Sequence, residues 1–360
     1  MTEKRRMLFL DMAKGISIIL VMMGHSCGFP FGGVYFTTFA MPLFFFVSGY
    51  TYKSGRSYGE NMKRRAKRLL IPYFGYSLLL FVLYAVKELI TGNTSIRDYV
   101  MAAAGVLYSR NCLYPLGYAG ENVYFFKLFN EATWFLTGMF IASGLFFAIV
   151  DKCIKNSRIM WISIAACIIA SVVLSYLPVL LPWSMDTACM SAAFMLCGAW
   201  GAGNVQSTAD SELREKKGRE NLIGVAALAV YIALCTFDGS TNFSIRNYGN
   251  HGLFSVVIYF LSGVTGSYAC LWLCRLLERT GGMKWAAQVG NNTLMLLCLH
   301  LVLFAYMDKA AYVLIGNLLH NRAVYWLYGG AKIVVVILLC YGLDRVMTEI
   351  KRRIKGKDKV

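Results

Sequence analysis

Charged side chains are scarce in this 360-residue chain. Only 15% of the residues are Asp, Glu, Lys or Arg, whereas 58% are hydrophobic. No stretch has the composition of a sizeable soluble domain. Instead, apolar runs of about 17 to 25 residues recur from end to end, which is the length needed to cross roughly 30 Å of hydrocarbon. The scarcity of charge excludes an ordinary soluble protein and predicts an all-α, polytopic integral membrane bundle.

Two further patterns are missing. The eleven cysteines have no paired spacing and lie almost all within apolar runs, as small buried hydrophobic residues do, so we expect neither a disulfide framework nor a metal site. The chain also lacks an internal repeat, inverted or parallel, of the kind that many transporters contain. This lack disfavours a transporter or exporter, although that function stays open as the alternative.

Ten membrane spans are predicted, at residues 7–27, 35–52, 70–90, 133–150, 159–177, 186–203, 221–237, 253–274, 289–308 and 325–344. A cytoplasmic N-terminus places 27 of the 36 lysines and arginines in cytoplasmic segments, six in outer segments and three within spans. This distribution fits the positive-inside rule, so both termini are predicted to be cytoplasmic, with residues 351–360 as a basic tail. The net charge of +17 is then mostly a topology signal plus attraction to membrane lipid, and no nucleic-acid partner is expected.

Two loops are long enough to need an interpretation. The outer loop at about 91–132 is rich in Tyr, Gly and Asn and is the natural lid or acceptor platform. Its apolar piece, from Tyr99 to Tyr108, is too short to span, so it lies in the interface or re-enters the bundle. The cytoplasmic loop 204–220 balances four acidic against four basic residues and is expected to be a solvated connector.

The first span contains three ionisable residues. In LDMAKGISIILVMMGH, residues 10–25, Asp11, Lys14 and His25 share one stripe of an ideal helix, and Lys14 and His25 lie roughly 16 Å apart along its axis. Such groups cost about 2.5–3.5 kcal/mol each inside a membrane on insertion scales, so they normally face a cavity or a partner and mark function. The alternatives are a simple interfacial Asp11–Lys14 pair, a snorkelling Lys14 and a structural His25.

The same stretch resembles the first-helix signature of the membrane-bound acyltransferase family 3, the bacterial O-acetyltransferases of surface sugars, in which a basic residue precedes a histidine by eleven positions. Further blocks are similar to later motifs of that family, in the same order: FAMPLFFFVSGYTY (39–52), KRRAKRLLIPYF (63–74), ATWFLTGMFIA (132–142), WSMDTACMSAAFMLCG (183–198) and VGNNTLMLLCLH (289–300). Block 63–74 resembles the basic cytoplasmic loop that leads into the third helix. Many members have Arg where this chain has Lys14, and the LD..KGI form is closer to the branch related to fucose 4-O-acetylases.

The resemblance implies an acyltransferase-3-like transmembrane domain over residues 1–350 in the bacterial cytoplasmic (inner) membrane. It also implies transfer of an acyl group from acyl-coenzyme A, such as acetyl-coenzyme A, to a hydroxyl of a sugar or lipid-linked glycan, without a permanently bound cofactor. A hydroxyl is a poor nucleophile at neutral pH, so a base must take its proton during the attack. His25 is the predicted catalytic base, and its expected burial would keep the imidazole neutral.

Cationic residues are expected to hold the phosphates of the donor. Lys14, Arg65 and Arg68 are the predicted ligands of acyl-coenzyme A, although topology alone would also explain the basic cluster at 63–68. Because Lys offers a point charge where Arg offers a bidentate fork, Lys14 leaves the fine substrate class open.

Further residues complete the predicted site. His300 in the ninth span is a second predicted catalytic residue: it would polarise the thioester carbonyl, hold the acceptor or orient His25, with a structural histidine as the alternative. Supporting roles are expected for Asp11, Asp186, Trp134 and Asn291. Asp186 would bind sugar hydroxyls or orient a histidine, unless it is an interface cap, and Trp134 would stack on a sugar ring or anchor the chain at the interface.

Two points of mechanism stay open at this level. Donor and acceptor meet directly in one pore, or an intermediate carrier relays the acyl group outward. Lys332 lies within the membrane, unless the last helix begins near Ala331, in which case it is interfacial. A sensor or ligand-uptake module on the same scaffold is the other alternative function.

Overall fold

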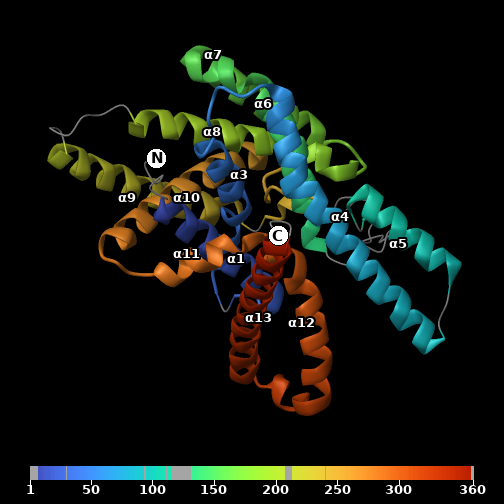
Figure 1. Cartoon of the computed structure of the whole chain (residues 1–360). Helices are drawn as coiled ribbons and strands as arrows, with labels where there is room; N and C mark the ends of the chain where they lie inside the picture. Colours follow the sequence, from blue (N-terminus) through green and yellow to red (C-terminus); the bar gives the residue numbers. More distant parts are fainter. Residues whose placement is uncertain are drawn as a thin grey trace. The chain divides into compact units, whose positions relative to one another are not determined.

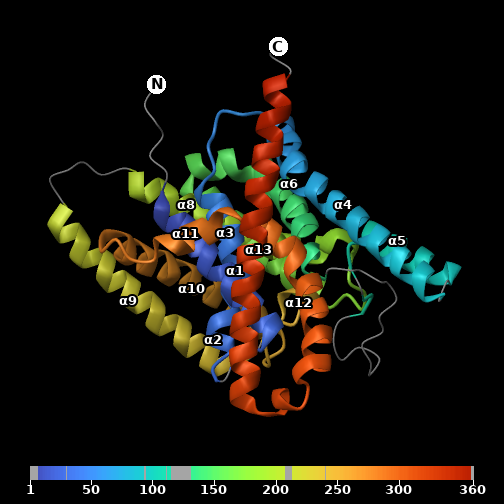
Figure 2. The same ribbon diagram turned by 60° about the horizontal axis from the view of Figure 1, so that its bottom comes forward.

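A computed structural model describes residues 7–29, 31–92, 95–110, 112–114, 131–206, 213–239 and 241–357. Over these ranges the regular structure is helical, apart from one isolated bridge between Asn242 and Asn247 (Figure 1, and turned by 60° in Figure 2). Eight of the described helices are long and apolar enough to cross a membrane. The predicted class, an all-α polytopic membrane bundle, is therefore confirmed.

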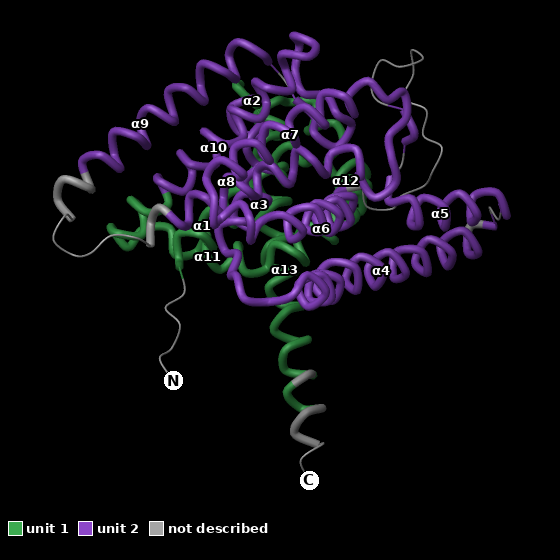
Figure 3. The backbone as a smooth tube through the Cα atoms, turned by 90° about the horizontal axis from the view of Figure 1, so that it is seen from above, with its two compact units in different colours: residues 1–33, 274–360 green, residues 34–273 purple. Residues whose placement is uncertain are grey.

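The chain divides into two compact units, coloured separately in Figure 3. Unit 1 comprises residues 1–33 and 274–360, and unit 2 comprises residues 34–273. Unit 1 thus combines segments from both ends of the chain. No shift of composition along the sequence indicated this division, and the sequence predicted a single transmembrane domain over residues 1–350.

Unit 1 contains the helices α1 (Leu8–Ser26), α11 (Lys284–Asn291), α12 (Thr293–Ile315) and α13 (Arg322–Lys357), with the short 3-10 helix η6 (Leu318–His320) before α13. Unit 2 contains α2 (Val34–Thr37), α3 (Ala40–Tyr50), α4 (Tyr58–Thr91), α5 (Ile96–Tyr108), α6 (Trp134–Lys155), α7 (Ser157–Ser175), α8 (Ala188–Gln206) and α9 (Leu213–Asp238). It also contains the 3-10 helices η2 (Glu131–Thr133), η3 (Pro182–Thr187) and η5 (Phe243–Ile245). Helix α10 (Leu253–Arg279) begins in unit 2 and ends in unit 1.

Eight of the ten predicted spans coincide with helices long and apolar enough to cross a membrane; the exceptions are 35–52, which covers the short helices α2 and α3, and 186–203, which covers most of α8. The predicted span 289–308 begins at the end of α11 and continues in α12, and α4 begins well before its predicted start near residue 70. Ser57 and Glu60 form a capping box: the Ser57 hydroxyl accepts from the Glu60 N–H, and the Glu60 carboxylate accepts from the Ser57 N–H at 2.9 Å. The basic cluster at 63–68 therefore lies in the first turns of α4. The prediction of a basic loop at this position was wrong.

The predicted lid loop is only partly described, because residues 93–94, 111 and 115–130 lie outside the described ranges. Its apolar piece forms the greater part of α5, which lies beside α4 in Figure 1. The Tyr73 hydroxyl of α4 donates to the Val106 carbonyl at 2.6 Å and ties the two helices together. Of the predicted connector 204–220, residues 207–212 lie outside the described ranges, and its two ends extend α8 and α9.

Helices α1 and α11 of unit 1 meet backbone to backbone at two glycines. A Cβ added to Gly15 would lie 1.9 Å from the carbonyl oxygen of Ala286, and one added to Gly290 would lie 1.8 Å from the carbonyl oxygen of Asp11. Main-chain atoms cannot turn away as a side chain can. Glycine at both positions is therefore what lets the two helices approach this closely.

Unit 2 uses the same arrangement where α3 crosses α8. A Cβ on Gly49 would lie 1.8 Å from the carbonyl oxygen of Met195, and one on Gly198 would lie 2.0 Å from the carbonyl oxygen of Phe46. Each helix thus contributes one glycine against the main chain of the other. The two crossings set the helix spacing within each unit.

Replacing Gly290 by Ala is expected to force α1 and α11 apart and to destabilise the protein by about 1–3 kcal/mol, the usual range for overpacking. The measurement is the apparent unfolding temperature of the detergent-solubilised chain. Gly330→Ala in α13 is the control, because its added Cβ would meet nothing within 4 Å. That variant should be neutral or slightly stabilised, since Ala favours a helix over Gly by about 1 kcal/mol. Equal unfolding temperatures for the two variants would contradict the close crossing.

Candidate functional site

Two histidines of unit 1, His25 and His300, lie side by side. His25 is in the last turn of α1, and His300 is in α12. Their ring centroids are 5.5 Å apart and the ring planes are inclined by 49°. We call these two residues the histidine pair. The structure thus brings together the two residues for which the sequence predicted catalysis.

His300 is completely buried, and its hydrogen bonding fixes where its lone pair lies. Its Nδ1 is 2.8 Å from the carbonyl oxygen of Leu296, which can only accept, so Nδ1 carries the hydrogen. In the neutral ring the lone pair is then on Nε2, which is buried and has no hydrogen-bond partner among the described residues. Phe304 packs edge-on against the ring, with centroids 5.7 Å apart.

His25 is exposed, which differs from the burial expected for it. His25 lies in the final turn of α1, which ends at Ser26. Asp11 and Lys14, on the same helix, form an ion pair of 2.6 Å between Lys14 Nζ and Asp11 Oδ1. The local pairing that the sequence allowed as an alternative is thus present, with Asp11 buried and Lys14 partly exposed.

Lys332 lies inside the helix rather than at its start, because α13 begins at Arg322. Lys332 was expected to be interfacial only if the last helix began near Ala331, and this is not the case. Only 2% of its surface is exposed, and its Nζ lies 2.7 Å from Asp308 Oδ1. The ammonium also lies 4.8 Å from the ring centroid of Phe304 and 5.2 Å from that of Tyr328. Phe304 thus contacts both the ammonium of Lys332 and the imidazole of His300.

The predicted donor ligands of unit 2 lie on α4. Arg65 is partly buried: its guanidinium donates to the Ser48 hydroxyl and lies 5.6 Å from the ring centroid of Phe147. Arg68, three residues further along the same helix, is exposed. At a spacing of three residues, Arg65 and Arg68 are neighbours on one face of the helix. Asn291, predicted as a supporting residue, is the exposed last residue of α11 in unit 1.

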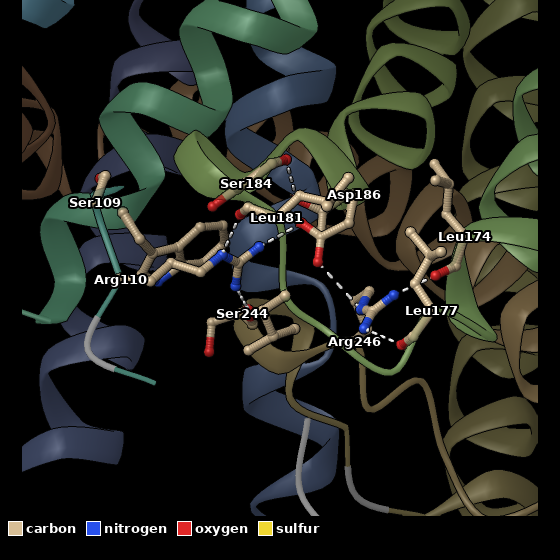
Figure 4. A network of polar contacts seen from close by, with 12 residues as sticks. Ser109, Arg110, Leu174, Leu177, Leu181, Ser184, Asp186, Ser244 and Arg246 are labelled. Atoms are coloured by element: carbon tan, nitrogen blue, oxygen red, sulfur yellow. Dashed lines mark hydrogen bonds and ion pairs between the residues drawn. The ribbon is translucent and has the colours of Figure 1, made fainter. Parts of the chain in front are cut away.

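Asp186 forms the centre of a buried cluster with two arginines of unit 2 (Figure 4). Arg110 Nη2 donates to Asp186 Oδ1, and Arg246 Nε lies 3.1 Å from Asp186 Oδ2. Both carboxylate oxygens are therefore engaged by guanidinium groups, and all three side chains are buried. We call Arg110, Asp186 and Arg246 the Arg–Asp–Arg cluster. This arrangement differs from all of the predicted roles of Asp186, as a ligand of sugar, an orienter of histidine or a cap.

The two guanidinium groups also hold the surrounding loops. The remaining contacts are to backbone carbonyls: Arg110 donates to Leu181 and Ser244, and Arg246 donates to Leu174, Leu177 and Val179. Of the five non-glycine residues with positive φ in the described ranges, four lie in these loops, namely Ser109, Trp183, Ser184 and Arg246. Each costs on the order of 1–3 kcal/mol and persists only where surrounding contacts enforce it. The cluster supplies such contacts.

Trp134 has a packing role in the structure. It is the buried first residue of α6, and its ring packs edge-on against Phe135 and Phe243, with centroids 6.1 Å away in each case. Neither sugar stacking nor an interfacial anchor, the two predicted roles, describes this position. The physical reason is burial, because neighbouring aromatic rings cover the indole.

One polar constellation escaped sequence reasoning. Asp238 ends α9 and pairs with His251 in the turn before α10, with 2.8 Å between Asp238 Oδ1 and His251 Nδ1. The signal that could have found it is an acidic residue ending an apolar span and a histidine just before the next span. The two residues are thirteen positions apart in the sequence, so only a folded turn brings them together.

Burial lowers the pKa of the Arg246 guanidinium, and the negative charge of Asp186 opposes this shift. Without Asp186, two buried guanidinium groups would face each other uncompensated. Asp186→Ala is therefore expected to cost about 3–5 kcal/mol of stability, as removal of one partner of a buried ion pair does. The loss of stability is measured as a fall in the apparent unfolding temperature of the detergent-solubilised chain.

Glu349→Ala provides the control for Asp186→Ala. Glu349 pairs with Arg353 on the exposed face of α13 at 3.1 Å, so its loss should cost at most about 1 kcal/mol. An Asp186→Ala protein with unchanged unfolding temperature and lost activity would instead assign Asp186 to substrate.

Comparison with known proteins agrees with the resemblance of the sequence motifs. No curated protein and no solved structure matches the chain. A family model described as an acyltransferase domain matches residues 7–345, a range that includes the histidine pair, Lys14, the basic residues of α4 and the Arg–Asp–Arg cluster. The chain therefore belongs to the acyltransferase 3 family and is a multi-pass membrane acyltransferase.

Proposed function

We propose that this acyltransferase moves an acyl group, in the first instance acetyl, from acyl-coenzyme A to a hydroxyl of a sugar or cell-surface glycan in the bacterial cytoplasmic membrane. The observation that carries the proposal is the histidine pair within a chain of this family. The imidazole of His300 is buried and fixed, and the imidazole of His25 beside it is exposed, so a substrate can reach it. Family membership disfavours the alternative of a transporter or uptake module.

In this mechanism His25 is the general base. It takes the proton of the acceptor hydroxyl while the hydroxyl oxygen attacks the thioester carbonyl carbon. The tetrahedral intermediate then collapses, the carbon–sulfur bond breaks, and the coenzyme A thiolate leaves and receives the proton from His25. His25 suits this task better than His300 because its side chain is exposed rather than fully buried.

The tautomer of His300 limits which of its three predicted functions it can perform. Its single N–H in the neutral ring is donated to Leu296, so no N–H is left to polarise the thioester carbonyl. The buried Nε2 lone pair can instead accept a hydrogen bond from His25 or from the acceptor. We therefore assign His300 a positioning role and exclude the first of its three predicted functions for the neutral ring.

Cations of both units are available for the donor. We propose that the pair Arg65 and Arg68 of unit 2 attracts the phosphates of coenzyme A. For Lys14 of unit 1, which is held by Asp11, binding of phosphate stays a prediction. Arg65 is already anchored by Ser48 and Phe147, whereas Arg68 is exposed and free to reach a ligand in solution. Hydrogen bonds between guanidinium and phosphate are among the stronger ones in proteins.

His25→Ala should lower kcat about 10²- to 10⁴-fold, the usual contribution of a general base, and leave the KM for acetyl-coenzyme A nearly unchanged. The assay measures alkali-labile label transferred from radioactive acetyl-coenzyme A to glycan-bearing membranes of the producing cells. His320→Ala is the matched control, because His320 is exposed and lies in η6, outside the histidine pair. A His25→Ala enzyme with wild-type kcat would exclude His25 as the base.

Arg68→Ala should raise the KM for acetyl-coenzyme A about tenfold, which corresponds to the loss of one charge-assisted hydrogen bond of roughly 1.5 kcal/mol. Acetyl-pantetheine, which lacks the nucleotide and its phosphates, is the control substrate. Its KM should be the same for Arg68→Ala and the wild type. An equal rise in KM for both substrates would show that Arg68 acts through packing and not through phosphate binding.

A further inference from the structure

The turn between α9 and α10 in unit 2 is built around the carboxylate of Asp238. Only 2% of this residue is exposed, and its Oδ1 accepts the N–H groups of Asn250 at 3.0 Å and His251 at 3.2 Å and the Ser255 hydroxyl at 2.8 Å. The imidazole Nδ1 of His251 is the fourth group at the same oxygen, at 2.8 Å. The other oxygen, Oδ2, is buried and has no hydrogen-bond partner among the described residues.

The backbone of the turn is shaped to admit this carboxylate. Gly249 has φ of 146°, and a Cβ at this position would lie 2.2 Å from Asp238 Oδ2. Two backbone N–H groups and one hydroxyl therefore already fasten α9 to the start of α10. The hydrogen bond from the His251 imidazole is therefore not needed to hold α9 and α10 together.

The imidazole is held in one orientation and is accessible. Its ring lies flat on Phe237, with centroids 4.4 Å apart and planes inclined by 11°. The side chain of His251 is 43% exposed and Phe237 is 62% exposed. Because the carboxylate can only accept, Nδ1 donates to it, and the lone pair of the neutral ring is on Nε2, on the far side of the ring from Asp238. A buried carboxylate thus orients an exposed hydrogen-bond acceptor.

We propose that Asp238, His251 and Phe237 form a sugar-binding site in unit 2, and this inference rests on the proposed function, in which a sugar is the acceptor. His251 Nε2 accepts a hydrogen bond from one sugar hydroxyl, and the buried carboxylate of Asp238 holds the imidazole in place through Nδ1. The exposed ring of Phe237 provides an apolar surface for the C–H face of the sugar. The negative charge of Asp238 disfavours an anionic ligand, so the geometry points to a neutral polyol.

The test measures sugar binding directly, without acyl-coenzyme A. The full-length chain, solubilised in detergent and fluorescently labelled, is applied to an array of mono- and oligosaccharides, and the dissociation constant of the best-bound sugar is then determined. His251→Phe keeps the flat ring on Phe237 but removes Nε2, so it should weaken binding at least tenfold. His251→Gln retains a hydrogen-bond acceptor and should lose less. His320→Phe, the control, should bind as the wild type does.

A second substitution protects the test against misfolding. Phe237→Leu removes the aromatic surface and leaves every hydrogen bond of Asp238 in place, so it should also weaken sugar binding several-fold while the unfolding temperature stays close to that of the wild type. The inference is overturned when the wild type binds no sugar on the array, or when His251→Phe and Phe237→Leu both bind with wild-type affinity.

The result can be separated from that of the proposed function. His25→Ala should bind the same sugars as the wild type, because His25 takes no part in this turn. A wild-type chain that binds sugars but transfers no acyl group contradicts the proposed function and leaves the sugar site standing. A chain that transfers acyl groups, but whose His251→Phe and Phe237→Leu variants bind sugars with wild-type affinity, contradicts the sugar site alone.

Discussion

The architecture of each unit depends on main-chain contact at paired glycines. In unit 1 the carbonyl of Asp11 faces Gly290, and the carbonyl of Ala286 faces Gly15. The crossing thus fixes the same turns of α1 that carry the Asp11–Lys14 pair. Helix α12 begins at Thr293, directly after α11, so the crossing also fixes the point from which α12 starts toward His300. The distance between the two imidazoles is therefore a consequence of how closely two glycines let helices approach.

In each unit, acidic side chains form ion pairs with basic ones, whereas the histidine pair of unit 1 consists of two imidazoles. Asp11 with Lys14, Asp308 with Lys332, and Asp186 with its two arginines form ion pairs, as groups removed from water require. Each pair holds its two side chains in place, because separating them would leave an uncompensated charge. Imidazoles can be buried neutral at lower cost, which is why His300 can be fully covered and still keep a lone pair for use.

The helices and the family could be predicted from the sequence because both depend on local patterns. Apolar length determines a span, and the quoted motif blocks contain Gly15, Gly49, Gly198 and Gly290, so the same residues identify the family and pack its helices. The start of α4 was missed because hydropathy does not register the capping box of Ser57 and Glu60. The contacts of Asp186 and Trp134 could not be predicted because each depends on partners more than fifty residues away, such as Arg246 and Phe243. His251 was overlooked because only the folded turn between α9 and α10 brings it to Asp238, thirteen positions earlier in the sequence.

Helix α13 is longer than a bilayer requires. Its 36 residues extend over about 54 Å, whereas the hydrocarbon core is only about 30 Å thick. Even a tilt of roughly 20° leaves some 20 Å of the helix beyond the hydrocarbon core. With Arg322 at one edge of the core, Arg352 lies about 42 Å away along the membrane normal, roughly 12 Å past the other edge. Because the headgroup layer occupies some 5–7 Å of this, Arg352 stays within the screening length of about 8 Å from it. The field of the cations at this end of α13 therefore acts on anionic headgroups as well as on anions dissolved in the surrounding solution.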